Sequence, residues 1–120
     1  MTFILGVNAF HADSSACLIK DGEVIFAIEE ERINRIKHWS GFPSKSIQHC
    51  LDFEDISIDN IDYITFNTNP KFNLNKKIFY VLKNALFLEI FKYLKKKNNN
   101  DIHKSFKKNF DIKDLEKKII

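Results

Sequence analysis

"FILGVNAFHADSSACLIKDGEVIFAIEEE", residues 3–31, contains three strand-like runs joined by short polar segments. The run Phe3–Phe10 is short, apolar and rich in branched side chains, which is typical of a buried strand. A second strand is predicted over Ser15–Lys20 and a third over Glu23–Glu31. The Asp21-Gly22 dipeptide between them is the strongest short-range signal for a β-hairpin. The chain is therefore predicted to open with an antiparallel β-meander.

A helix and a fourth strand are predicted to follow the meander. Ile47, Cys50 and Leu51 recur at helical spacing, which predicts a helix that begins at Ser44 with the Ser44 side chain as its N-cap. The run Tyr63–Phe66 predicts the fourth strand. A strand that follows a helix, added to a meander, indicates an α/β fold and not a closed β-barrel.

The charge of the chain changes sign near residue 71. Residues 1–70 contain 5 Lys or Arg and 11 Asp or Glu, whereas residues 71–120 contain 14 and 5. We therefore predict two parts of one lobe. Residues 1–70 form the meander, the helix and the fourth strand, and residues 71–120 form a basic amphipathic helical segment.

Three helices are predicted within the basic segment. Apolar residues within 75–97 recur on one wide face, which predicts a long amphipathic helix. Asp101 is predicted to cap a second helix that runs to about Asn109, and Asp111 is predicted to cap a third, short one. The lysines of this segment are spread along the helices with no arginine among them, which argues against nucleic-acid readout. They form either a solvated face or a surface for an acidic partner or an anionic membrane.

The length and the termini set further expectations. A chain of 120 residues is enough for one modest domain. The apolar start is too short for a secretory signal, and no run reaches the roughly 18 apolar residues of a membrane span. We expect a cytoplasmic protein without a transmembrane segment, with Cys17 and Cys50 as buried thiols. Four strands and one long helix make a thin layer, and the apolar ending Ile119-Ile120 would be ordinary before another strand, so we expect an incomplete domain.

Four polar residues between the first two strands are candidates for chemistry. His11 could take a proton from a hydroxyl nucleophile, because the ordinary pKa of histidine lies near neutrality. Asp13, Ser14 and Ser15 could cradle a phosphate or hold a substrate hydroxyl. Alternatively, Asp13 and Ser14 only satisfy the backbone of the turn.

A second group of candidates follows the third strand. Glu29, Glu30 and Glu31 precede the basic residues Arg32, Arg35, Lys37 and His38. Arg35 and Lys37 could pair with a phosphate or a carbamoyl-type carbonyl; a solvated, salt-bridged face is the alternative. Trp39 and Phe42 are expected to pack beneath the loop. The four histidines show neither HxxxH nor HExxH spacing, so no metal site is predicted in this chain.

"ILGVNAFHADSSACLIKDGEVIFAIEEERINRIKHWSGFP", residues 4–43, resembles the start of the O-carbamoyltransferases of the nodulation-factor and antibiotic-tailoring type. The shared pattern is an HxDSSA-like turn, a strand, "DG", a second strand, then "EEERxxRxKH" and "GFP". A weaker similarity continues through "IDYITFNTNPKFNL". The resemblance implies an actin-like ATPase (ribonuclease H-like) fold, of which this chain would be the N-terminal part.

The resemblance also implies a reaction. Full-length members of this family make carbamoyl-adenylate from carbamoyl phosphate and ATP, and pass the carbamoyl group to a hydroxyl of a sugar or natural product. By resemblance, His11 is the catalytic base and Lys37 contacts the donor or the acceptor. Asp13, Ser14, Ser15 and Arg35 would bind substrate.

The chain departs from the family pattern in two ways. Ala12 separates His11 from Asp13, which are adjacent in the familiar spelling of the motif. The HHxxH-type motif for a divalent metal and the adenylate-forming domain would lie beyond residue 120. The resemblance therefore implies a fragment that is inactive alone, with a second polypeptide as one source of the missing half. The alternatives are an actin-like sugar kinase lobe and a non-enzymatic basic interaction module.

Overall fold

The computed structural model describes residues 1–67, 75–76, 79–80, 102–112 and 114–120. Two compact units are present: residues Met1–Asn67 with Ile102–Ile120, and residues Thr68–Asp101. The elements of the first unit are β1 (Phe3–Asn8), β2 (Ser15–Lys20), β3 (Glu23–Glu29), α1 (Glu30–Asn34), α2 (Ser44–Phe53), a 3₁₀ turn η1 (Ile58–Asn60), β4 (Tyr63–Phe66), α5 (Ile102–Asn109) and α6 (Leu115–Lys118).

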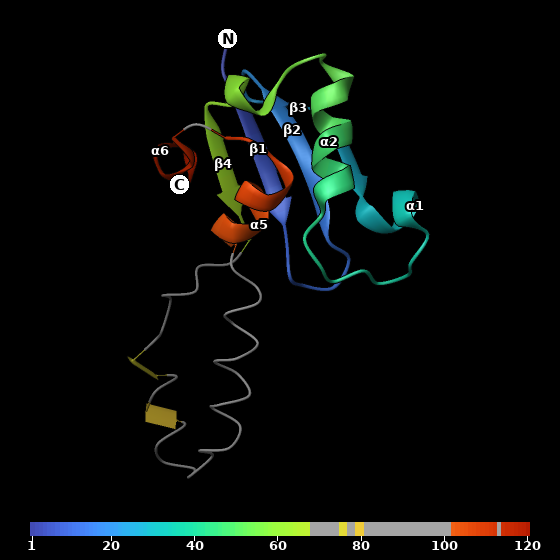
Figure 1. The fold of residues 1–120 in the computed structure, drawn as a ribbon, viewed down its shortest axis with the longest axis vertical. Helices are drawn as coiled ribbons and strands as arrows, with labels where there is room; N and C mark the ends of the chain where they lie inside the picture. Colours follow the sequence, from blue (N-terminus) through green and yellow to red (C-terminus); the bar gives the residue numbers. More distant parts are fainter. Residues whose placement is uncertain (68–74, 77–78, 81–101, 113) are drawn as a thin grey trace. The chain divides into compact units, whose positions relative to one another are not determined.

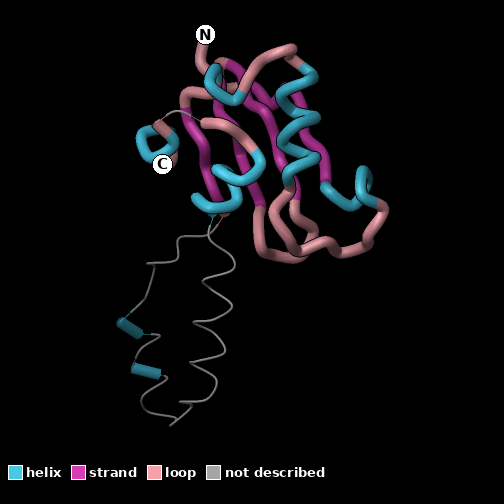
Figure 2. The backbone as a smooth tube through the Cα atoms, viewed as in Figure 1, coloured by secondary structure: helices cyan, strands magenta, loops and turns pink. Residues whose placement is uncertain are grey.

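The four strands form one mixed sheet in the order β3-β2-β1-β4 (Figures 1 and 2). Strand β2 is antiparallel to both β1 and β3, so the predicted meander is confirmed. The turn residues Asp21 and Gly22 both have positive φ, at 51° and 92°, as a tight hairpin requires. Strand β4 lies parallel to β1 after the crossover through α2. The fold is therefore mixed α/β, as predicted.

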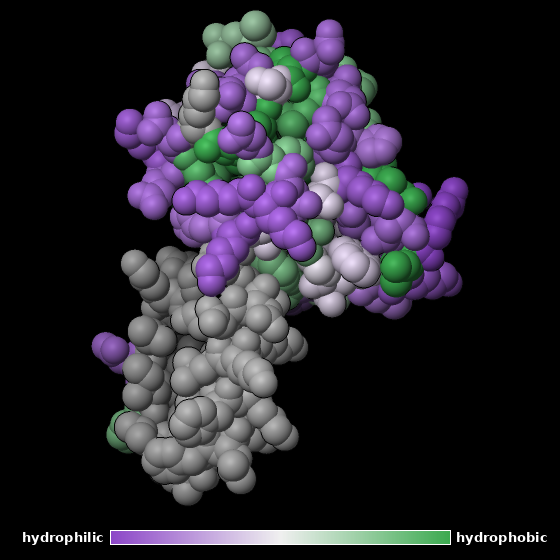
Figure 3. Space-filling view, viewed as in Figure 1, coloured by the Kyte–Doolittle hydropathy of each residue, from purple (hydrophilic) through white to green (hydrophobic). Residues whose placement is uncertain are grey.

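One face of the sheet carries the hydrophobic core. Side chains alternate along β1, so that Phe3, Leu5 and Val7 are buried while the residues between them face the other side. Helix α2 packs on β2 and β3, and α5 brings the fully buried Phe106 onto the same face (Figure 1). Hydrophilic side chains cover the outer surfaces of both helices, with apolar side chains visible between them (Figure 3).

The ring of Phe106 joins distant parts of this core. It contacts the Phe42 ring edge-on at a centroid distance of 4.9 Å and the Phe66 ring at 5.9 Å. Phe42 also contacts Phe10 at 6.3 Å, so the loop before α2 is anchored to the turn after β1. The predicted packing of Phe42 beneath the loop is confirmed.

The C-terminal residues extend the sheet beyond β4. Ile119 forms a parallel bridge with Ile64, and the backbone N–H of Ile120 donates to the Ile64 carbonyl at 3.1 Å. The short helix before this bridge begins at Leu115 with Asp114 as its N-cap. The prediction that Asp111 caps it was wrong, because the chain still runs through a non-helical segment at Asp111.

The second predicted helix of the basic segment is confirmed as α5, although Asp101, its predicted cap, lies outside the described residues. Most of the long amphipathic helix predicted over 75–97 also lies outside them. The division at residue 70 stays a prediction, although Ile102–Ile120 pack into the same unit as the sheet. Within the part of the chain that the structure describes, no helix has the length and apolar character to cross a membrane.

Strand β3 ends at Glu29, two residues earlier than predicted, because Glu30 turns inward and starts α1. The Glu30 side chain is 3% exposed. Its carboxylate accepts hydrogen bonds from the backbone N–H of Ser46 at 2.7 Å, the Ser46 hydroxyl at 2.8 Å and the N–H of Lys45 at 3.3 Å. Glu30 therefore caps the N-terminus of α2 from a distance in sequence. The predicted Ser44 cap was wrong, since Pro43 holds the N-cap position.

Candidate functional site

The turn between β1 and β2 projects from one end of the sheet. Phe10 and Asp13 both adopt left-handed backbone conformations, with φ of 57° and 58°. The Asn8 side-chain amide stabilises this turn, because its Nδ2 donates to the Asp13 carbonyl at 3.0 Å and to the Ala12 carbonyl at 3.4 Å. A polar side chain at the end of β1 therefore satisfies the turn backbone and leaves the side chains of His11 and Asp13 exposed.

Ser14 joins this turn to the loop between α1 and α2. Its hydroxyl donates to the Gly41 carbonyl at 2.8 Å and lies 3.2 Å from the His11 carbonyl, and its side chain is buried. Its backbone N–H donates to the Trp39 carbonyl at 2.9 Å. The structure thus places the Ser14 hydroxyl inward as a link. Its direct contact with a substrate stays a prediction.

The other predicted site residues lie on the two segments that Ser14 joins. His11 is exposed, and its Nδ1 lies 3.4 Å from the Ala12 carbonyl oxygen. In the tautomer that donates through Nδ1, Nε2 is left as a proton acceptor. Arg35 and Lys37 are exposed in the loop between α1 and α2, and Arg35 closes α1 in a left-handed conformation with φ of 63°. The link through Ser14 therefore brings the turn of His11 and the loop of Lys37 together.

A charged contact joins the same two segments at the surface. The Nδ1 atom of His38 lies 2.9 Å from Oδ1 of Asp13, and the backbone N–H of His38 donates to Glu31 Oε2 at 2.9 Å. The hydrogen bond to Asp13, the charge of Asp13 and the charge of Glu31 together raise the pKa of His38 above its ordinary value of 6.5. His38 therefore keeps its positive charge to higher pH than a free histidine.

Replacing Asp13 with asparagine is expected to lower the pKa of His38, measured by NMR from the pH dependence of its imidazole proton shifts. The raised pKa contributes stability that is fully present below the unfolded pKa of 6.5 and is lost as pH rises through the folded value. The stability difference between wild type and Asp13→Asn should accordingly be larger at pH 5.5 than at pH 9. His49 on α2 is exposed and serves as the internal reference. An unchanged His38 titration would contradict the contact.

Asp13, Glu31 and His38 could also be considered as metal ligands. Their ligand atoms all lie within 4.8 Å of one another. In the structure, His38 Nδ1 is hydrogen-bonded to Asp13 Oδ1, whereas the Glu31 carboxylate accepts from the backbone N–H of His38. A metal would have to replace the Asp13–His38 hydrogen bond. The absence of a metal site stays a prediction, and what the structure shows is a charged contact between the turn and the loop.

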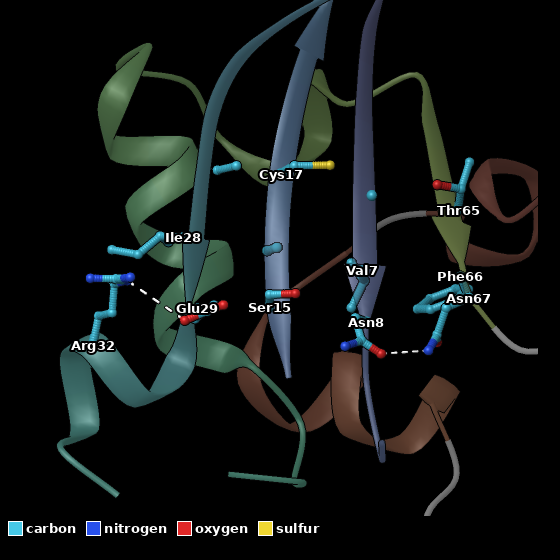
Figure 4. Close-up of a pocket in the computed structure, with 13 residues that line it drawn as sticks. Val7, Asn8, Ser15, Cys17, Ile28, Glu29, Arg32, Thr65, Phe66 and Asn67 are labelled. Atoms are coloured by element: carbon cyan, nitrogen blue, oxygen red, sulfur yellow. Dashed lines mark hydrogen bonds and ion pairs between the residues drawn. The ribbon is translucent and has the colours of Figure 1, made fainter. Parts of the chain in front are cut away.

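A hollow of about 640 Å³ lies on the side of the sheet away from α2 (Figure 4). Ser15, one of the predicted site residues, lines it together with Cys17. Cys17 is half-buried, which corrects the expectation of two buried thiols. Cys50 is fully buried in the core, and burial, with a smaller effect of Cys17, raises the pKa of its thiol to about 12.

Asn8 and Asn67 were not identified from the sequence as parts of a site, and His38 was named only within the second group of candidates, with no role of its own. Asn8 orders the turn, Asn67 donates from its Nδ2 to the Asn8 side-chain oxygen, and His38 binds Asp13. The polar residue at the end of an otherwise apolar strand was the available signal for Asn8. Asn67 lies 59 residues away from Asn8 in sequence, and no local pattern indicates that they meet.

Comparison with known proteins gives evidence on the family of this chain. A family model described as "Carbamoyltransferase N-terminus" matches residues 3–120. "Uncharacterized protein sll1178" of Synechocystis is 46% identical over 70 residues, which is 58% of this chain and 11% of that protein. "Nodulation protein NolNO" of Sinorhizobium fredii is 45% identical over 65 residues, or 54% of this chain and 10% of that protein. The chain therefore matches about a tenth of the length of either relative.

A solved structure also shows a partial likeness. YeaZ from Pseudomonas aeruginosa has a TM-score of 0.42 and 15% sequence identity, over 58% of this chain and 31% of that one. A likeness of this extent is too weak to assign the fold more finely than mixed α/β.

Proposed function

This chain belongs to the carbamoyltransferase N-terminus family, and on that basis we propose that it supplies part of a site where a carbamoyl group passes to a hydroxyl acceptor. The acceptor is a sugar or a related natural product, and the donor derives from carbamoyl phosphate through carbamoyl-adenylate. The family match favours this reaction over a sugar kinase. The described residues do not test the alternative of a basic interaction module, because most of its lysines lie outside them.

The observation that carries the proposal is the link between the turn after β1 and the loop before α2. Ser14 and the Asp13–His38 contact join these segments, with distances of 2.9 Å for both Ser14 N to Trp39 O and His38 Nδ1 to Asp13 Oδ1. His11 stands exposed on one segment and Lys37 on the other. A base and a cation on adjoining exposed segments suit an acyl-type transfer to a hydroxyl.

In the proposed step, the acceptor hydroxyl oxygen attacks the carbonyl carbon of carbamoyl-adenylate. The new O–C bond forms, the bond from that carbon to the adenylate phosphate oxygen breaks, and AMP leaves. Nε2 of His11 takes the hydroxyl proton. In this proposal Lys37 stabilises the negative charge that develops on the carbonyl oxygen, and Arg35 is the second cation, paired with the leaving phosphate.

ATP and a divalent metal belong to the remainder of the full-length protein in this proposal. Arg35 and Lys37 could contact a phosphate, and the groups that hold the adenine ring and the triphosphate are proposed to lie in the remainder of the protein. When bound elsewhere in the site, ATP would supply the activated carbamoyl donor. The relatives, about ten times longer than the matched segment, have room for such a part.

The proposal predicts that the 120-residue chain alone does not turn over, whereas a chimera does. In the chimera, residues 3–120 replace the matching segment of a full-length carbamoyltransferase of the family. With carbamoyl phosphate, ATP and the acceptor of that enzyme, we expect carbamoylated product by mass spectrometry from the chimera only. A folded chimera that makes no product, under conditions in which the parent enzyme does, would contradict the proposal. Turnover by the chain alone would contradict its dependence on the remainder.

A further inference from the structure

The sheet face opposite α2 is organised in rows that cross the strands. The strand registers align Ala27 with Cys17, Cys17 with Gly6 and Gly6 with Thr65, so that small side chains stand side by side across all four strands. The row nearer the Asp21-Gly22 hairpin contains Ile4, Ile19 and the 42% exposed Tyr63. The hollow therefore exists because a row of small residues adjoins a row of larger ones.

The side chains next to Gly6 lie so close that they leave no room for a side chain at this position of the floor of the hollow. A Cβ atom added at Gly6 would lie only 2.6 Å from the Cys17 sulfur and 3.7 Å from the Thr65 hydroxyl oxygen. Because the row of small residues crosses four strands at about 4.8 Å spacing, the hollow is roughly 14 Å long. A volume of about 640 Å³ falls within the ordinary range for small-molecule sites.

The row on the other side of the hollow is polar. The registers align Asn8 with Ser15 and Ser15 with Glu29, and Asn67 joins this row through its hydrogen bond to Asn8 (Figure 4). Amides and hydroxyls of this kind both donate and accept hydrogen bonds. Because the Asn8 amide already bonds to the turn and to Asn67, the groups of this row that could bond the hydroxyls of a polyhydroxylated molecule are the Ser15 hydroxyl, the Glu29 carboxylate and the Asn67 side-chain oxygen.

The charge of the described lining residues favours a neutral ligand over an anion. Two ionised side chains line the hollow, Glu29 and Arg32, and they form an ion pair at 3.6 Å between Oε2 and Nε. No lysine is among the described residues that line the hollow. A phosphate would need a cation that is not already paired, whereas a neutral ligand would not.

We propose that this hollow binds the neutral, polyhydroxylated acceptor, with its hydroxyls on the polar row and on the Thr65 hydroxyl, and its carbon skeleton on the rest of the small-residue floor. The inference rests on the proposed carbamoyl transfer and names the place of its acceptor. Asn8 connects the hollow with the turn that carries His11, because it lines the hollow and its amide donates to two carbonyls of that turn. An acceptor hydroxyl bound at the polar row would therefore lie beside the turn that carries His11, the proposed base.

The first test is protection of the Cys17 thiol in the full 120-residue chain. Alkylation by iodoacetamide is followed at each cysteine by mass spectrometry, and Cys50 is the internal control because its buried thiol, with a pKa of about 12, stays protonated. Methyl glucoside and N-acetylglucosamine at tens of millimolar should slow Cys17 labelling several-fold. Inorganic phosphate and glucose 6-phosphate should protect less. Equal or better protection by the phosphates, or no protection by either neutral sugar, would overturn the inference.

The second test uses the chimera, so that failure of the acceptor site and failure of the reaction are distinguishable. Thr65→Val removes one hydroxyl from the hollow at nearly constant volume. We expect the KM for the acceptor to rise about 5- to 10-fold, the loss of one hydrogen bond, while the KM for carbamoyl phosphate changes less than about 2-fold. Tyr63→Phe, on the same face of β4 outside the hollow, is the matched control. A chimera that transfers normally but shows an unchanged acceptor KM, or a shifted carbamoyl phosphate KM, would overturn the acceptor site alone.

Discussion

Replacing His11 with alanine in the chimera is expected to lower kcat for carbamoyl transfer by about 10²- to 10⁴-fold, the usual contribution of a general base. The physical reason is that the acceptor hydroxyl must lose its proton as the new bond to the carbamoyl carbon forms. His11 is exposed and contacts the Ala12 carbonyl through Nδ1 at 3.4 Å, which leaves Nε2 to accept that proton. Since the side chain supports no buried contact, the stability of the protein should change little.

The matched control is His49→Ala, because His49 is also exposed but lies on α2. It should retain the activity of the unsubstituted chimera to within about 2-fold, as expected for a surface substitution away from the reacting groups. Thermal unfolding of both variants separates lost chemistry from lost structure. A folded His11→Ala chimera that keeps its kcat would remove His11 from the reaction and leave Lys37 without a partner base.

Local sequence signals predicted most of the fold for a physical reason. The apolar, branched run predicted as a strand over Phe3–Phe10 and the helical spacing in Ser44–Phe53 depend only on which side chains each element buries. The Asp21-Gly22 turn depends on the backbone freedom of two adjacent residues. Each of these signals is contained within a few residues, so the strands, the hairpin and α2 could be predicted without knowledge of the rest of the chain.

The features that the sequence did not predict depend on contacts between distant residues. Three successive glutamates resemble a solvated face, yet the middle one, Glu30, is buried because Ser46 supplies its hydrogen bonds from 16 residues away. His38 reaches Asp13 over 25 residues. No periodicity encodes such pairs. The candidate site was therefore identified as residue types on two separate segments, whereas their linkage through Ser14 required the structure.

Replacing Glu30 with alanine is expected to cost about 3 kcal/mol of the free energy of unfolding, a large share of the stability of a small domain. The substitution leaves the backbone N–H and hydroxyl of Ser46 buried without their acceptor. It also removes a negative charge from the N-terminus of α2, where the helix dipole favours one. Urea unfolding of the full chain, followed by circular dichroism, measures the change.

The neighbouring Glu29→Gln is the control, since its exposed ion pair with Arg32 contributes at most about 1 kcal/mol. A double-mutant cycle with Ser46→Ala tests the mechanism: the Ser46 substitution should cost about 1 kcal/mol less when Glu30 is already alanine. Additive costs would show that Glu30 does not act through the Ser46 hydroxyl.

The effect of Glu30→Ala should extend to the candidate site. The backbone N–H of Glu30 donates to the Ser14 carbonyl at 2.9 Å, while its side chain holds the start of α2. One residue thus fixes both ends of the loop that carries Lys37 relative to the turn that carries His11. In Glu30→Ala, His38 should therefore titrate closer to its ordinary pKa as the Asp13 contact loosens. An unchanged His38 pKa in a measurably destabilised variant would mean that the site keeps its geometry without this anchor.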